Sequence, residues 1–121
     1  MVMILVVDDL PDTCRVLVRL LRISGYQAEH VSSGDQAMAV MKAIKPQLVV
    51  LDEMMPGKSG MDVLKELKAK PELADVPVLF YSASYDPTKA EQAKQMGAVD
   101  WLVKGSTQWT ELLGKISTLA H

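Results

Sequence analysis

The chain has 121 residues, of which 49% are apolar, so it can bury the core of one domain and is not disordered. We interpret residues 1–121 as a single domain. The net charge is −2 at pH 7, with Lys and Arg spread along the chain, which argues against a nucleic-acid surface in this domain. The single Cys14 excludes an internal disulfide, and we find neither a signal peptide nor an apolar run that could cross a membrane. We therefore expect a cytoplasmic protein without membrane contact.

The first half of the chain alternates strand and helix signals. Two short runs are wholly apolar, which is typical of strands buried on both faces of a parallel sheet. The helices between the strands are bounded by proline or a Ser-Gln capping box at the start, and by glycine or proline at the end. The expected elements are a strand at Met3–Val7, a helix from Pro11 to Gly25, a strand at Gln27–Val31, a helix from Ser33 to Pro46 (capping box Ser33 and Gln36) and a strand at Leu48–Leu51. The expected inner faces are Cys14, Leu17, Val18 and Leu21 on the first helix, and Ala37, Val40, Met41 and Ile44 on the second.

The second half repeats this alternation. A loop with the turn pair Pro56-Gly57 precedes a third helix, whose apolar residues recur at helical spacing. The expected elements are this helix with Val63, Leu64 and Leu67 inward, a strand at Val76–Tyr81, a helix from Asp86 to Gly97, a strand at Trp101–Val103 and a last helix capped by Thr107, with Leu112, Leu113, Ile116 and Leu119 inward.

This alternation predicts the α/β class, because parallel strands need crossover helices that cover both faces of the sheet. We expect a flavodoxin-like, doubly wound sandwich with a five-stranded parallel sheet of order 2-1-3-4-5, flanked by five helices. In this order the first and third strands lie side by side where the connections change direction. Ligands of such sheets bind there, at the carboxyl ends of the strands.

Polar side chains follow four of the five expected strands. Asp8 and Asp9 follow the first strand, Asp52 the third, Ser82 the fourth and Lys104 the fifth. Because these strand ends meet at one edge of the sheet, we expect the three carboxylates to converge. Like charges held close together need a cation, and an all-oxygen ligand set favours Mg²⁺.

These residues, in this order at the strand ends, resemble the receiver domain of response regulators, the phosphoaccepting switch of two-component signalling, of the chemotaxis-regulator type. The stretch Leu51–Gly57 is similar to the aspartate loop of that family, and the likeness runs from Met3 to about Leu119. The resemblance implies that Asp52 is a phosphoacceptor served by a histidine kinase, a phosphotransfer protein or a small phosphodonor.

The resemblance also implies roles for the neighbouring residues. The implied Mg²⁺ ligands are Asp8, Asp9, Asp52 and the backbone carbonyl of Met54. Lys104 and Ser82 would contact phosphoryl oxygens, and Trp101 would be a switch aromatic that turns inward. The surface of the fourth helix, fifth strand and fifth helix would then change and bind a downstream output domain or protein, or a second copy in a homodimer. The only catalysis implied is phosphorylation and dephosphorylation of the chain itself, so we expect no enzyme.

Three positions depart from the family pattern. Gly105 stands where the family usually has a proline after the lysine in a cis peptide, so Lys104 is expected to be held less firmly. Glu53 occupies a position that is usually apolar, and we expect it to point outward toward a partner. Trp101 replaces a smaller aromatic, and its bulk is expected to hinder inward rotation and weaken coupling to the output surface. An aromatic in a strand can also be a plain core residue.

Other functions share parts of this pattern. The main alternative is a phosphate-independent interaction module of the same fold, in which the site residues would have only a structural role. A haloacid-dehalogenase-type phosphatase also uses an aspartyl phosphate, but it requires a second Asp where this chain has Met54. A flavodoxin-like electron carrier requires a phosphate loop rich in Ser, Thr and Gly, and the acidic Asp8-Asp9 pair has the wrong charge for one.

Overall fold

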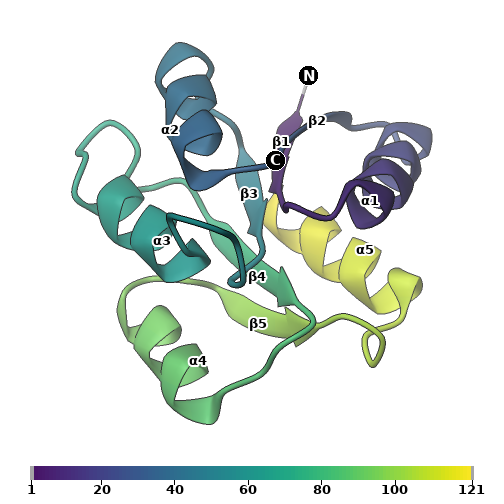
Figure 1. Cartoon of the computed structure of the whole chain (residues 1–121). Helices are drawn as coiled ribbons and strands as arrows, with labels where there is room; N and C mark the ends of the chain where they lie inside the picture. Colours follow the sequence, from purple (N-terminus) through teal and green to yellow (C-terminus); the bar gives the residue numbers. More distant parts are fainter. Residues whose placement is uncertain (1, 121) are drawn as a thin grey trace.

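The polypeptide forms a five-stranded parallel sheet in the order β2-β1-β3-β4-β5, which confirms the predicted topology. The structure is a computed structural model that describes residues 2–120. Strands and helices alternate strictly along the chain (Figure 1). The elements are β1 (Met3–Val7), α1 (Pro11–Ile23), β2 (Gln27–Val31), α2 (Gly34–Ala43), β3 (Leu48–Leu51), α3 (Gly60–Lys68), β4 (Val78–Ser82), α4 (Pro87–Gln95), β5 (Asp100–Val103) and α5 (Trp109–Leu119).

Two hydrophobic cores lie on the two faces of the sheet. Successive strand residues point to opposite faces, so Leu5 of β1 packs in one core and Ile4 in the other. Figure 1 shows α1 and α5 on one side of the sheet and α2, α3 and α4 on the other. The central strands β1, β3 and β4 are buried throughout, as expected for strands covered on both faces. All four residues predicted for the inner face of α1 are buried.

Several predicted boundaries and faces are wrong in detail. The fourth strand starts two residues later than predicted, at Val78, since Pro77 has no N–H for a ladder and contributes only its carbonyl, to Val49 N–H at 3.0 Å. Ile44 is 55% exposed because it lies past the end of α2, where its backbone is already extended. The Thr107 hydroxyl does not cap α5; it accepts a hydrogen bond from Val103 N–H, and the helix begins one residue later, after Gln108.

Helix caps also differ from the prediction. Ser33 caps α2 through Gln36 N–H, but the Gln36 side chain accepts from Ser32 N–H instead of closing the box on Ser33. The reciprocal capping box lies at the start of α3, where Ser59 and Asp62 each accept the other's backbone N–H. This box fixes the beginning of α3, at the end of the loop that follows β3.

Candidate functional site

The ends of β1 and β3 place two of the predicted aspartates next to each other. Val7 is paired with Leu51 in the sheet, so Asp8 and Asp52 are the next residues on adjacent strands. Backbone hydrogen bonds hold both: Asp8 N–H donates to Val31 at 3.1 Å, and Asp52 N–H donates to Val7 at 2.9 Å. One carboxylate oxygen from each of Asp8, Asp9 and Asp52 lies within 4.8 Å of the other two. The predicted convergence of the three carboxylates is therefore present in the structure.

Lys104 reaches this cluster from the end of β5. Its backbone N–H donates to Ser82 at 2.8 Å, which continues the pairing of β4 and β5 by one residue. Its ammonium group forms an ion pair with Asp8 and lies 3.7 Å from Asp52 Oδ2. The lysine side chain is only 12% exposed. Lys104 thus contacts two carboxylates, although Gly105 adopts a positive φ of 86° and residues 2–120 contain no cis peptide bond. That Lys104 is held less firmly than it would be with a proline at position 105 stays a prediction.

Asp52 combines burial with an unpartnered carboxylate oxygen. It is 4% exposed, and within residues 2–120 its buried Oδ1 has no hydrogen-bond partner. Burial raises the pKa of Asp52, although the nearby Ser82 hydroxyl, the Lys104 ammonium and the Met54 N–H oppose this shift. An unpartnered buried carboxylate oxygen beside two further carboxylates fits a hard divalent cation such as Mg²⁺.

Ser82 and Trp101 both contact Ser84, in the loop that follows β4. Ser82 is fully buried at the end of β4, and its hydroxyl lies 3.2 Å from that of Ser84. Trp101 is 6% exposed and stacks on Phe80, with ring centroids 4.7 Å apart and planes within 6°. Its indole N–H donates to the Ser84 carbonyl at 3.1 Å. The bulk of Trp101 thus does not keep the ring outside, because a flat stack on Phe80 accommodates it in the core.

The Glu53 side chain points inward, so the expectation that it faces a partner is wrong. Glu53 is 3% exposed, and its carboxylate accepts the Met61 N–H at 2.7 Å. It also lies 3.5 Å from the ammonium group of Lys89 on α4. Burial raises the pKa of Glu53, and the Met61 N–H and Lys89 act in the opposite direction. The side chain of Met54, in contrast, is 62% exposed at the rim of the site.

Gly60, the first residue of α3, supports the site but was not identified from the sequence. A Cβ at this position would collide with the backbone carbonyl of Asp52, and would lie 2.9 Å from both Glu53 Cα and the Phe80 ring. Only glycine lets α3 approach the Asp52–Glu53 peptide this closely. Its place directly after the capping serine, Ser59, is the only sequence signal that could have indicated this role.

The metal-free protein should become more stable when Asp52 is replaced by asparagine. A raised carboxyl pKa means that the folded state binds the proton more tightly than the unfolded state. Protonation of Asp52 therefore stabilises the folded state fully at pH values below about 3.9, the pKa of this carboxyl in the unfolded chain. This stabilisation is lost as the pH rises through the higher pKa that the carboxyl has in the folded chain. At pH 7.5 with a chelator, we therefore expect Asp52→Asn to raise the free energy of unfolding by about 1 kcal/mol.

Urea denaturation at pH 7.5 and at pH 4 tests this prediction. The advantage of the variant should shrink at pH 4, where more of the wild-type carboxyl is protonated. A variant less stable than the wild type at pH 7.5 would show that Lys104 fully compensates the Asp52 charge.

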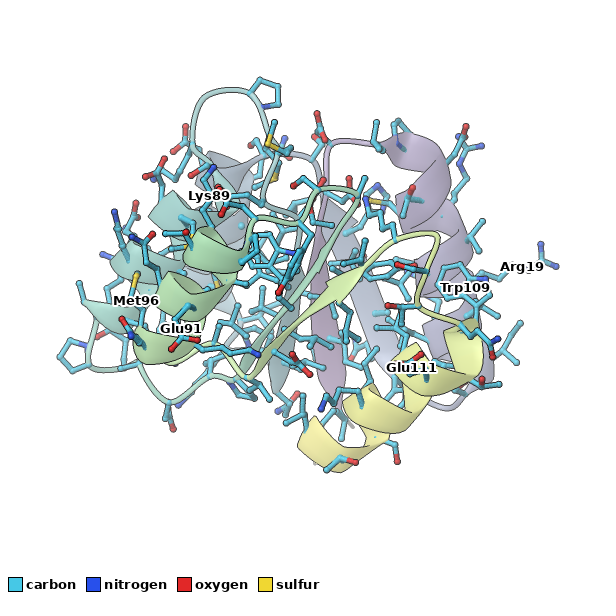
Figure 2. All side chains as sticks on the ribbon, turned by 90° about the horizontal axis from the view of Figure 1, so that it is seen from below. Arg19, Lys89, Glu91, Met96, Trp109 and Glu111 are labelled. Atoms are coloured by element: carbon cyan, nitrogen blue, oxygen red, sulfur yellow. The ribbon has the colours of Figure 1, made fainter. Side chains whose placement is uncertain are left out.

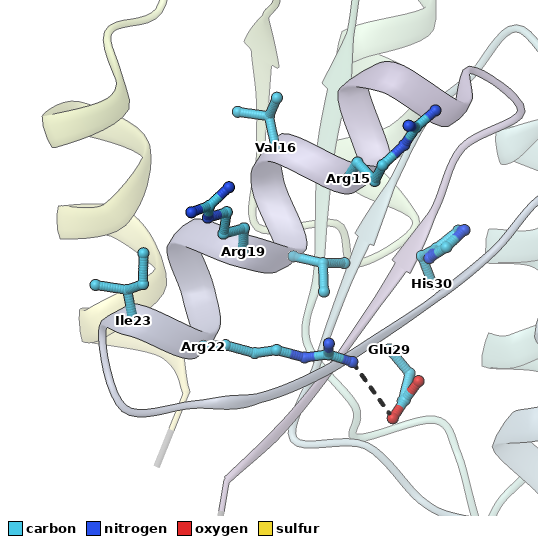
Figure 3. A pocket seen from close by; sticks show the side chains of 8 residues that line it. Arg15, Val16, Arg19, Arg22, Ile23, Glu29 and His30 are labelled. Carbon is cyan, nitrogen blue, oxygen red and sulfur yellow. Dashed lines mark ion pairs between the residues drawn. The ribbon is translucent and has the colours of Figure 1, made fainter.

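One cavity lies away from this site. It is an open groove of about 690 Å³ between α1 and the edge strand β2 (Figure 3). Arg15, Arg19 and Arg22 are among the residues that line it, and Arg22 lies 3.7 Å from Glu29. The groove contains none of the predicted site residues, so we do not assign it to the carboxylate site.

Comparison with known proteins agrees with the fold. The response regulator receiver domain family matches residues 4–116. The DNA-binding response regulator MtrA of Mycolicibacterium smegmatis is 35% identical over 101 residues, which are 84% of this chain and 43% of that protein. The two-component response regulator ORR3 of Oryza sativa subsp. indica is 35% identical over 102 residues, covering 84% of this chain and 78% of its own length. The chain thus spans less than half of one curated relative and over three quarters of another.

Solved structures show the same similarity. Chemotaxis protein CheY4 of Vibrio cholerae has a TM-score of 0.90 and 25% identity, with 98% of each chain covered. The response regulator TrrA of Thermotoga maritima, solved in complex with Mg²⁺-BeF, has a TM-score of 0.86 and 30% identity, covering 98% of this chain and 99% of its own. A parallel sheet of this order with an acidic cluster at its carboxyl edge defines a signalling domain of the receiver class. The chain belongs to the response regulator receiver domain family of two-component systems.

Proposed function

We propose that Asp52 accepts a phosphoryl group and that the chain works as a phosphorylation-controlled switch. The observation that carries this proposal is the buried, unpartnered Oδ1 of Asp52, adjacent to two further carboxylates and an ammonium group. A carboxylate has two oxygens, so Asp52 can bind a cation through one of them and use the other as a nucleophile. The family membership of the chain supports the same role.

The transfer itself would break one bond and form one bond. An Asp52 oxygen attacks phosphorus, and the bond between phosphorus and the donor atom breaks, with its electron pair leaving on the donor. For a phosphohistidine donor, the imidazole nitrogen leaves and takes up a proton from water. Lys104 would balance negative charge on a phosphoryl oxygen, and the Ser82 hydroxyl would donate to another. Phosphoryl transfer depends mainly on such positioning and charge balance.

Mg²⁺ would neutralise charge on the phosphoryl oxygens when bound. The residues that would hold it are Asp8, Asp9 and Asp52, together with the backbone carbonyl of Met54. Asp8 already accepts the Leu10 N–H at 2.9 Å through Oδ1, which orients its carboxylate toward the cluster. The paired Lys104 would have to share Asp8 with the cation.

The partners proposed for this chain follow from the same chemistry. A histidine kinase or phosphotransfer protein would supply the phosphoryl group, and a downstream output domain or protein would bind the surface of α4, β5 and α5. A homodimer through that surface, a single domain over residues 1–121 and a cytoplasmic location stay predictions. Within residues 2–120, no helix has the length and apolar character needed to cross a membrane.

Intact-mass measurement after incubation with acetyl phosphate tests the proposed function. We expect one phosphoryl adduct that requires Mg²⁺ and is absent in Asp52→Asn. The Glu91→Gln variant, changed on the exposed side of α4, serves as the matched control and should be labelled like the wild type. A folded wild-type chain without any adduct would favour the alternative, a phosphate-independent interaction module.

A further inference from the structure

Glu53 is a buried carboxylate beside the phosphoacceptor that the proposed phosphoryl transfer does not use. A charge held at 3% exposure is costly unless it is paired and hydrogen-bonded. Glu53 has both kinds of partner, and they come from different helices. Oε2 accepts the N–H of Met61 in α3 at 2.7 Å, and Oε1 lies 3.5 Å from Nζ of Lys89 in α4.

The contacts with α3 fix the loop immediately after Asp52. The Glu53 backbone carbonyl accepts the N–H of Gly60 at 3.0 Å, and its side chain accepts the next N–H along the helix. Glu53 therefore satisfies two of the free N–H groups at the start of α3, where the helix dipole also favours an anion. The main chain on the carboxyl side of Asp52 has little freedom to move without α3.

The contact with α4 connects a second helix to the same residue. Lys89 lies in the first turn of α4, and Figure 2 shows it at one end of the helix with Met96 at the other. Its side chain is 47% exposed, whereas the Glu53 side chain is 4% exposed. Glu53 is the only acidic side chain that forms an ion pair with Lys89 in the described part of the chain. The link between α4 and the loop of Asp52 thus depends on one charge pair.

We infer that Glu53 is a positioning residue that connects α3 and the first turn of α4 to the loop of the phosphoacceptor, Asp52. Through the Glu53–Lys89 ion pair, charge changes at Asp52 reach α4. This inference rests on the proposed function for its biological meaning. Its physical basis is that Asp52 and Glu53 are adjacent residues of one loop, so a shift of Asp52 on binding a cation or a phosphoryl group also moves the Glu53 carboxylate. Lys89 lies 3.5 Å from that carboxylate, so α4 responds to the displacement. The route is separate from the one through Ser82 and Trp101.

Hydrogen exchange in the metal-free protein tests whether the Glu53–Lys89 ion pair holds the first turn of α4. The Ala90 amide, which donates to Asp86 at 2.9 Å, reports opening of the first turn of α4. We expect Lys89→Met and Glu53→Gln each to speed its exchange about fivefold, and Lys89→Arg to restore it. The Met61 amide should stay protected in Glu53→Gln, because the amide oxygen still accepts its hydrogen bond.

A control on the same helix distinguishes the effect of the Glu53–Lys89 ion pair from the effect of removing any lysine charge from α4. Lys94 also lies on α4 and forms an ion pair of similar length, 3.7 Å, but with Asp100 of β5. Lys94→Met should leave the Ala90 amide at the wild-type rate. Unchanged exchange in Lys89→Met and Glu53→Gln, or an equal increase in Lys94→Met, would overturn the inference.

A Mg²⁺ titration followed by amide chemical shifts tests the transmission to α4. In the wild type, the signals of Thr88 and Lys89 should move together with that of Asp9. In Glu53→Gln, we expect the Asp9 shift to persist and the two α4 shifts to fall at least about threefold, since the charged link is gone. Wild-type α4 shifts in this variant would contradict transmission through Glu53. Neither measurement requires phosphorylation, so a failure of the proposed function would be seen separately in the mass experiment.

Discussion

Replacing Gly60 with alanine should destabilise the protein by about 3 kcal/mol, because the new Cβ would overlap the Asp52 carbonyl and press against Glu53 and Phe80. The colliding atoms are backbone and a buried ring, so no flexible side chain can move aside. Either α3 or the Asp52 loop must shift, and phosphorylation of Asp52 should slow with it. Urea denaturation and the acetyl phosphate reaction measure the two effects.

Gly114 offers a matched control with the opposite sign. It lies within α5, and a Cβ there would have no heavy atom within 4 Å. Gly114→Ala should therefore stabilise the protein by about 0.5–1 kcal/mol, since alanine loses less backbone entropy than glycine in a helix. A Gly60→Ala protein as stable as the wild type would mean that the start of α3 is not packed against the Asp52 peptide.

Replacing Lys104 with methionine should change metal binding and phosphorylation in opposite directions. The ammonium group pairs with Asp8 and lies 3.7 Å from Asp52, so it competes with a cation for the carboxylates. Without it, we expect Mg²⁺ to bind about tenfold more tightly. Phosphorylation by acetyl phosphate should nevertheless slow at least about 100-fold, because the ammonium group that would balance one of the phosphoryl oxygens is gone. In a chelator, two buried carboxylates lose their partner, which should cost about 3 kcal/mol of stability.

Calorimetric Mg²⁺ titration, the mass assay and urea denaturation together measure these effects. The control is Lys115→Met, which removes a lysine that pairs at 3.2 Å with Asp100, away from the carboxylate cluster. This variant should match the wild type in metal affinity and phosphorylation. Weaker Mg²⁺ binding in Lys104→Met would show that Lys104 organises the metal site instead of competing with the metal.

The position of the site could be predicted because it follows from local patterns. Apolar runs identified the buried strands, and the alternation with helices implied parallel pairing, which the strand register confirms. Once the order of the strands was known, the residues directly after them had to lie along one edge. Asp8, Asp52 and Lys104 needed no further information to be brought together.

The direction of individual side chains next to the site could not be predicted in the same way. Glu53 is the second residue past the end of β3, where the alternation of a strand no longer applies, and its burial depends on partners in α3 and α4. Trp101 could be assigned to a strand, but its inward position depends on the flat surface of Phe80 on the neighbouring strand.

The sequence by itself thus determined the class of fold and the set of polar residues at the carboxyl ends of the strands. It only predicted the order of the strands, which the structure confirms. Only the tertiary structure decided how the charges of these polar residues are compensated. Lys104 pairs with Asp8, 96 residues away, while Asp52 keeps one oxygen free and Glu53 links two helices. The physical reason is that hydrophobic periodicity is a local property of the chain, whereas compensation of a buried charge depends on distances between residues that only the folded chain brings together.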